Sequence, residues 1–287
     1  SATQVSGAGA SIEDMAELAN PTGADPWFLM PYRADEAYVR NFAQLVHARL
    51  DPRRRVYVEL GNEVWNDMFD ATRQAQREGV LLGLGSGDRT RAGAIRYAQK
   101  VCQTMRIWSE IFVDQRDRLI RVIASQNARP ELADIILGHA DTANCIDALA
   151  TAPYIWLDLN AQGAGAQNWV FAHMPRAIDE TIEYAAHNRA IAARHGKRFI
   201  AYEGGQHLVT PDLALARSLQ RDVRMEAVYR AYLARWNQRI RSDLMLYAST
   251  APIGDYGSWG LREYAGQPLD ETPKLRAVRT FMAGTPR

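Results

Sequence analysis

Short apolar runs rich in β-branched and aromatic residues alternate with long stretches of helical periodicity along this chain of 287 residues. Such alternation is typical of α/β proteins, in which helices connect the strands of a parallel sheet. The expected strands are 27–31, 56–60, 119–124, 148–150, 198–202 and 244–248. The expected helices are 11–19, 39–50, 130–138, 175–195, 211–241 and 272–283, with at least two more within 64–117. Two connections, 64–117 and 155–174, are long and follow the C-terminal end of a strand, where barrel enzymes build their sites.

The charge balance argues against two classes of partner. Lys and Arg number 34 and Asp and Glu number 33, so no strong net field favours nucleic acid or an anionic membrane. No apolar run reaches the ~20 residues that a membrane helix needs. We therefore expect neither a nucleic-acid nor a membrane partner. The segment 1–10 has no charged n-region and no apolar h-region, so it is not a signal peptide and the compartment stays open.

The cysteine, histidine and glycine patterns indicate no cofactor. Cys102 and Cys145 are too few for a disulfide framework or a four-cysteine zinc site. We expect both to be small buried hydrophobes, with a single bridge between them as the alternative. The six histidines show no His-Glu-x-x-His spacing. The glycine-rich run 83–87 follows no strand and lacks the Lys-Ser/Thr of a phosphate-binding loop. Neither a metal nor a nucleotide is expected.

Two expected strands end in a glutamate with polar or glycine neighbours. The strand that begins at residue 56 leads into Asn62 and Glu63, followed by Trp65. The strand that begins at residue 198 leads into Glu203 and two glycines, which let the backbone turn tightly. A lone glutamate at a strand end is usually solvated or ion-paired. Two such carboxylates at C-terminal strand ends, accompanied by an amide and an indole, instead favour sugar chemistry.

These motifs resemble a known group of enzymes. Gly61-Asn-Glu-Val-Trp-Asn66 together with Ala201-Tyr-Glu-Gly-Gly205 resembles the clan A glycoside hydrolases, the retaining (β/α)8 enzymes that include family 5 cellulases and mannanases. Segments 18–20, 27–32 and 56–66 also resemble a bacterial group of cellulase-like proteins. The resemblance implies a (β/α)8 TIM-type barrel, an oligo- or polysaccharide substrate, no cofactor, and a secreted or periplasmic location.

The resemblance also implies roles for single residues. In that clan an Asn-Glu pair ends the fourth strand and supplies the acid/base, and a Glu ends the seventh strand and is the nucleophile. Glu63 accordingly becomes the acid/base and Glu203 the nucleophile. Asn62 would bind the sugar 2-hydroxyl. Tyr154 would orient the nucleophile, with an ordinary half-buried tyrosine as the alternative.

Aromatic residues complete the expected site. The resemblance implies that Trp259 is the stacking platform for the sugar. Trp65, Trp156 and Trp27 are further stacking candidates, with simple packing as the alternative for each. His207 is expected to line the sugar cleft. Tyr32 and Arg33 stand where relatives often have a His, which leaves the substrate's identity open.

The expected function is therefore that of a retaining glycoside hydrolase that cleaves a β-linked glycan by double displacement. Its two carboxyl groups would lie about 5–5.5 Å apart, because a direct nucleophile leaves no room for an intervening water. The alternative is a non-catalytic glycan-binding barrel.

The strand count gives one more expectation. If Glu63 ends the fourth strand, then 27–31 is the third, and 1–10 holds no apolar run for the first two. We therefore expect a single catalytic domain over 1–287 that is N-terminally incomplete. Its first two βα units would come from an upstream segment or a second chain.

Overall fold

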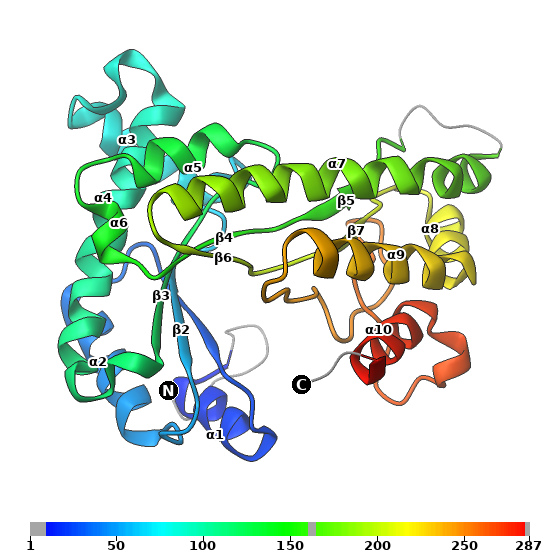
Figure 1. The fold of residues 1–287 in the computed structure, drawn as a ribbon, viewed down its shortest axis with the longest axis horizontal. Coiled ribbons are helices and arrows are strands. Elements are labelled where there is room, and N and C mark those ends of the chain that lie inside the picture. Colours follow the sequence, from blue (N-terminus) through cyan, green and yellow to red (C-terminus); the bar gives the residue numbers. More distant parts are fainter. Residues whose placement is uncertain (1–9, 160–164, 285–287) are drawn as a thin grey trace. The chain divides into compact units, whose positions relative to one another are not determined.

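The structure, a computed structural model, describes residues 10–159 and 165–284. The chain divides into two compact units (Figure 1). The first unit comprises 1–150 and 191–199, and the second comprises 151–190 and 200–287. Most of the segment 1–10, for which no strand is expected, lies outside the described residues.

The first unit alternates helices with parallel strands. Its strands are β1 (Trp27–Met30), β2 (Val56–Leu60), β3 (Leu119–Ala124), β4 (Ala148–Thr151) as far as residue 150, and the first half of β6 (Arg198–Ala201). Its α-helices are α1 (Ile12–Thr22), α2 (Glu36–Arg49), α3 (Asp70–Leu81), α4 (Arg89–Ile111), α5 (Pro130–Leu137) and α6 (Thr142–Cys145). Two 3-10 helices, η2 (Leu84–Gly87) and η3 (Val113–Arg118), flank α4.

The sheet has the strand order β1-β2-β3-β4-β6, and the registered neighbours β1 to β4 run parallel. Every residue of β2 is buried, as expected for a parallel strand covered on both faces. Phe42 of α2 packs against Trp108 of α4 with ring centroids 5.9 Å apart, and Trp108 is fully buried. The predicted start of α1 is confirmed. Ser11 accepts a hydrogen bond from the amide of Asp14 over 3.0 Å and caps α1, as the sequence predicts.

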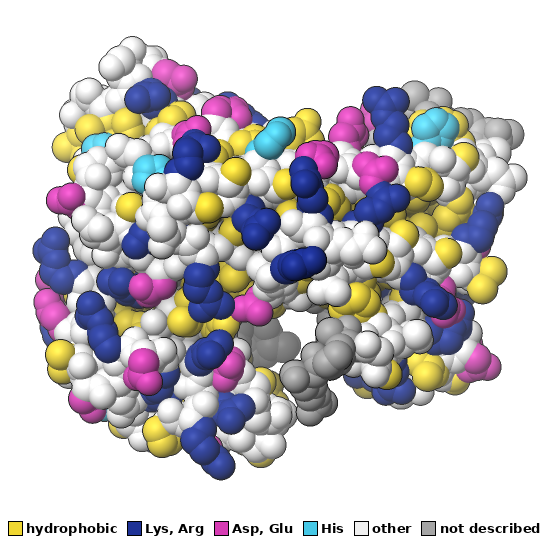
Figure 2. All heavy atoms as spheres, in the orientation of Figure 1, with side chains coloured by type: hydrophobic (Ala, Val, Ile, Leu, Met, Phe, Trp, Pro, Cys, Tyr) yellow, Lys and Arg dark blue, Asp and Glu magenta, His cyan; other side chains and the backbone are white. Residues whose placement is uncertain are grey.

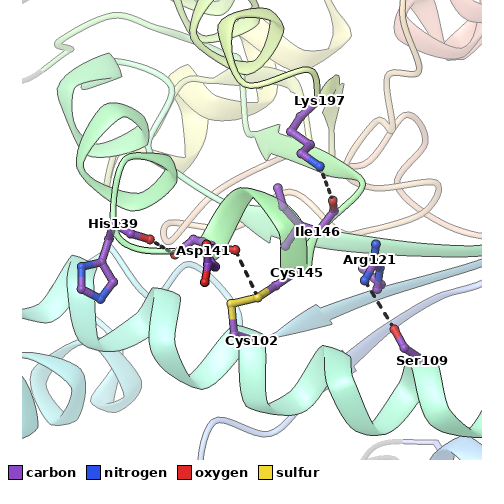
Figure 3. Close-up of a disulfide and its surroundings, with 9 residues drawn as sticks. Cys102, Ser109, Arg121, His139, Asp141, Cys145, Ile146 and Lys197 are labelled. Atoms are coloured by element: carbon purple, nitrogen blue, oxygen red, sulfur yellow. Dashed lines mark hydrogen bonds between the residues drawn. A yellow bond between two sulfur atoms is a disulfide. The ribbon is translucent and has the colours of Figure 1, made fainter.

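The expectation for the cysteines is wrong. Cys102 of α4 and Cys145 at the end of α6 form a disulfide with their Cα atoms 5.1 Å apart (Figure 3). Both residues are half-buried rather than buried. The bridge ties α4 to the segment that enters β4, where Lys197 also donates to the carbonyl of Ile146 over 3.1 Å. The tertiary fold brings the two residues together across 43 positions of sequence.

The described part of the second unit combines strands with four α-helices and a 3-10 helix. Its strands are β5 (Tyr154–Trp156), β7 (Gly205–His207), the end of β4 and the second half of β6. Its α-helices are α7 (Ala166–Arg194) as far as residue 190, α8 (Leu213–Arg221), α9 (Arg224–Arg239) and α10 (Pro273–Gly284), and η4 (Leu269–Glu271) is a 3-10 helix. β5 and β7 pair in parallel, with Tyr154 beside Gly205 and Trp156 beside His207.

Three predictions of secondary structure are wrong in part. The expected strand 244–248 is reduced to one parallel bridge between Leu244 and Ala201. The strand it would pair with ends at Ala201, and the glycine turn that follows breaks the regular ladder. Helix α7 begins at Ala166, inside the expected loop 155–174. The expected helix 211–241 is two helices, α8 and α9.

The α/β class is thus confirmed, but the closed (β/α)8 barrel is not found. Within 10–159 and 165–284 the main sheet has five strands. That 1–287 forms one catalytic domain stays a prediction, as does the supply of further strands from an upstream segment or a second chain.

The surface is mixed in charge. Basic and acidic side chains are interspersed over the visible face (Figure 2). Many are paired, as Arg221 is with Glu263 over 2.8 Å and Arg276 with Glu226 over 2.7 Å. Among the helices that the structure describes, none combines the length and the apolar character needed to cross a membrane.

Candidate active site

Glu63 stands in a tight turn after β2. Gly61 and Glu63 have φ angles of 69° and 46°, both in the left-handed region. The amide of Gly61 bonds the carbonyl of Met30 over 2.7 Å, which keeps the start of the turn attached to β1. A Cβ at Gly61 would lie 2.7 Å from Cγ2 of Val64, so glycine is required there. A glutamate in the left-handed region is strained, and such strain clusters at functional sites.

The carboxyl group of Glu63 is held by a residue to which sequence reasoning assigned no role. Asn66 donates from Nδ2 to Oε2 of Glu63 over 2.8 Å. The backbone amide of Asn66 and the hydroxyl of Thr72 both donate to the Glu63 carbonyl, over 2.8 and 3.2 Å. Glu63 is buried. The backbone bonds therefore hold the turn, and the Asn66 side chain orients the carboxyl group, as an acid/base residue needs. The sequence signal for this contact is the side-chain amide of Asn66, three positions after Glu63.

The two neighbours of Glu63 in the motif differ in their surroundings. Asn62 is half-buried beside it. Trp65 lines a largely apolar cavity with Val64, Thr72 and Tyr97, and its buried indole N–H has no hydrogen-bond partner among the described residues. This environment favours the packing alternative for Trp65 over a role in sugar stacking.

Trp27 is also engaged within the first unit. Its ring stacks on Tyr57 with centroids 5.3 Å apart, and its indole N–H donates to Oε2 of Glu59 over 3.0 Å. Glu59 is buried and is the second-last residue of β2. Glu59 is a buried carboxylate that the sequence analysis did not single out, although strand alternation places it on the same face as Glu63.

Glu203 follows β6 in the second unit, in a turn that only glycine permits. A Cβ at Gly204 would lie 2.7 Å from the hydroxyl oxygen of Tyr232. A Cβ at Gly205, where φ is 131°, would lie 2.8 Å from the hydroxyl oxygen of Tyr229. The chain therefore passes directly against two buried tyrosines as it leaves Glu203. The tight glycine turn that the sequence predicts is present.

Tyr154 binds the Glu203 carboxylate. Its phenol donates to Oε2 of Glu203 over 2.8 Å. Tyr154 is the first residue of β5, and its carbonyl accepts a hydrogen bond from Thr181 of α7 over 3.0 Å. A phenol anchored in this way can hold the carboxylate in one rotamer and stabilise its charge.

His207 and Trp259 extend the site from Tyr154. The rings of Tyr154 and His207 lie edge to face with centroids 5.5 Å apart, and those of His207 and Trp259 lie 5.6 Å apart. The indole N–H of Trp259 donates to Nδ1 of His207 over 3.4 Å, which assigns the proton of neutral His207 to Nε2. Burial lowers the pKa of His207 below its ordinary value, so the neutral ring that accepts this bond is favoured.

Two tyrosines that the sequence analysis did not single out surround Trp259. Tyr247 and Tyr256 both make edge contacts with its ring, with centroids 5.9 and 6.0 Å away. Both are exposed, as is Trp156 of β5 with 62 % of its surface accessible. Exposed aromatic faces near a carboxylate are typical of sugar-binding sites.

The candidate residues thus gather in two groups, one in each unit. Glu63 and Asn62 lie in the turn after β2. Glu203 lies with Tyr154, and the ring contacts continue to His207 and Trp259. The separation of the two carboxyl groups stays a prediction. Within the described ranges no group of three or more His, Cys, Asp or Glu side chains is arranged to hold a metal ion.

No family model and no curated protein matches the chain. Solved structures do match in fold. An α-L-arabinofuranosidase of family 51 from Bifidobacterium longum aligns with a TM-score of 0.60 and 11% identity, over 94% of this chain and 56% of its own. A 4-O-α-L-rhamnosyl-β-D-glucuronidase from Fusarium oxysporum 12S aligns with a TM-score of 0.56 and 12% identity, over 98% of this chain and 56% of its own. An α-L-arabinofuranosidase from Thermotoga maritima aligns with a TM-score of 0.51 and 11% identity, over 88% of this chain and 49% of its own.

These likenesses concern the fold alone. The chain is similar to part of the TIM-barrel glycosidases and spans about half the length of those structures. The narrower resemblance to family 5 and to cellulase-like proteins is not confirmed by any of them.

Proposed function

We propose that this chain carries the catalytic residues of a retaining glycoside hydrolase. The observation that carries the proposal is the Glu203 carboxylate, which accepts the phenol of Tyr154 in a turn next to His207. Trp259 adds an aromatic face to the same group. The likeness in fold to glycosidases supports the same class of reaction.

In the proposed mechanism Glu203 attacks the anomeric carbon and forms a glycosyl-enzyme. Glu63, in its protonated form, gives its proton to the leaving oxygen. Glu63 then takes a proton from water, which attacks the anomeric carbon and releases Glu203. Tyr154 stabilises the Glu203 carboxylate before attack and after release. Both carboxylates would belong to one catalytic domain, about 5–5.5 Å apart.

The proposed substrate is a β-linked oligo- or polysaccharide. Asn62 would bind the 2-hydroxyl, and Trp259 would stack on the sugar next to the cleaved bond. Trp156, which is exposed, is a further stacking surface. The Cys102–Cys145 disulfide supports a secreted or periplasmic location, because such bonds persist in oxidising compartments.

The test is a panel of aryl glycosides that includes β-glucosides, β-mannosides, β-xylosides, β-glucuronides and α-L-arabinofuranosides. A burst of aryl alcohol followed by slower turnover is expected on at least one of them, with the sugar bound covalently to Glu203 in the trapped protein. A chain that binds glycans without any burst would support the alternative, a non-catalytic glycan-binding barrel.

A further inference from the structure

Four buried groups of the second unit close a ring of hydrogen bonds. Lys274 donates from Nζ to Oε1 of Gln220 over 2.7 Å and to the carbonyl of Ser258 over 3.1 Å. Gln220 donates from Nε2 to Oε1 of Gln206 over 3.3 Å. Gln206 donates from Nε2 back to the Ser258 carbonyl over 2.7 Å. All four residues are buried, and Lys274 is 4% exposed. We call these residues the Lys274 ring.

The corners of the Lys274 ring come from four separate parts of the unit. Lys274 lies in the first turn of α10 and Gln220 near the end of α8. Gln206 is the middle residue of β7, and Ser258 lies in the loop before α10. A buried network of this kind specifies one arrangement of the elements that it joins, because any broken bond leaves a buried polar group unpaired.

Two corners adjoin residues of the candidate site. Gln206 precedes His207, and its Oε1 also accepts the backbone amide of Leu208 over 2.9 Å, so the backbone on both sides of His207 is tied to the ring. Ser258 precedes Trp259, and two donors converge on its carbonyl. The hydrogen bond from Trp259 to Nδ1 of His207 then joins the two side chains that these backbones carry.

Lys274 has no carboxylate among its hydrogen-bond partners in the described residues. Its two acceptors are a neutral amide oxygen and a backbone carbonyl. Glu263 is the nearby charge that favours the ammonium form, and Glu263 is itself paired with Arg221. A neutral amine still has two N–H groups, which match the two acceptors. The ring is therefore complete in either protonation state of the lysine.

We propose that Lys274 is a positioning residue for the sugar platform: through the ring it fixes His207 and Trp259 against each other and so sets the subsite that they form beside Glu203. Lys274 does not touch the substrate. The inference rests on the proposed function in one respect, namely that His207 and Trp259 contact the sugar.

The first test does not need a substrate. The protein is labelled with 5-fluorotryptophan, and the Trp259 resonance is assigned by its loss in Trp259→Phe. Lys274→Met and Gln220→Met each break the ring at a corner outside the site. We expect both to shift or broaden the Trp259 resonance while most other tryptophan resonances stay in place. Arg276→Met is the matched control, since it removes a cation from the same helix that pairs with Glu226 outside the ring.

The second test uses the aryl glycoside that gives the highest turnover. We expect Lys274→Met and Gln220→Met to lower kcat/KM roughly 10- to 100-fold, as small displacements of binding groups do, and Arg276→Met to leave it nearly unchanged. If Lys274→Met does not fold, Gln220→Met decides both tests. An unchanged Trp259 resonance in a folded ring variant would overturn the inference. If the wild-type protein hydrolyses no glycoside, the proposed function fails, while the resonance still shows whether the ring positions Trp259.

Discussion

The phenolic oxygen of Tyr154 lies 2.8 Å from Oε2 of Glu203, although 49 positions separate the two residues in the chain. Tyr154 opens β5, and Glu203 stands two residues before β7, the strand that pairs with β5. The pairing places residue 154 beside residue 205, and the glycine turn brings the carboxylate back to the phenol. The contact is thus a consequence of strand register, and it gives the proposed nucleophile a fixed partner.

Tyr154→Phe is expected to reduce turnover because it removes the hydrogen bond that stabilises the carboxylate charge returning to Glu203 as the glycosyl-enzyme is hydrolysed. Such bonds contribute roughly 1.5–3 kcal/mol, which corresponds to a rate roughly 10- to 100-fold lower. Steady-state kinetics on the best aryl glycoside would measure the loss. Tyr184→Phe, on the exposed part of α7, is the control and should keep wild-type kinetics. Equal rates in the two variants would remove Tyr154 from the site.

Glu63→Ala is expected to separate the two chemical steps. An activated aryl group can leave without a proton donor, so glycosyl-enzyme formation should persist on such a substrate. Its hydrolysis should be slow, since no base remains to activate water, and added azide should restore turnover. Product analysis should then show a glycosyl azide. Glu131→Ala, an exposed residue paired with Arg129, is the control. A folded Glu63→Ala variant that azide does not rescue would contradict the acid/base role.

Sequence reasoning succeeded where the signal was local. The cap of α1 at Ser11 depends on neighbouring residues alone. Likewise, Gly204 and Gly205 predict the tight turn after Glu203, because only glycine lets the backbone come so close to the two tyrosine hydroxyls.

Sequence reasoning failed where the outcome depends on tertiary packing. The disulfide joins residues 43 positions apart, and no spacing rule connects Cys102 to Cys145. A lysine near the start of an amphipathic helix is normally solvated, so the burial of Lys274 cannot be inferred before α8 and α10 are placed. The role of Asn66 likewise follows from the left-handed turn at Glu63, which the sequence pattern does not specify.

The Cys102–Cys145 bridge is expected to stabilise the first unit. A loop of this length corresponds to about 4 kcal/mol if the whole effect comes from the restricted unfolded chain. Urea unfolding with and without a reductant would measure the difference in the free energy of unfolding. Cys102→Ser/Cys145→Ser is the control, which should have the lower stability and be indifferent to reductant. A wild-type protein equally indifferent to reductant would show that the bridge does not form.

The buried amine of Lys274 is expected to make stability rise with pH above neutrality. Desolvation lowers its pKa to about 7 in the folded protein, from about 10.5 in a solvated chain, while Glu263 opposes the shift. Between these values the unfolded chain holds a proton that the folded protein has released, so raising the pH favours the folded state. Below about pH 7 both states hold the proton, and this contribution no longer changes.

Urea unfolding at several values between pH 7 and pH 9.5 would give the free energies of unfolding. Lys274→Met cannot titrate, so the wild-type free energy should rise relative to that of the variant, by at most about 1.4 kcal/mol per pH unit. Parallel pH profiles for the two proteins would show that folding does not lower the pKa of Lys274.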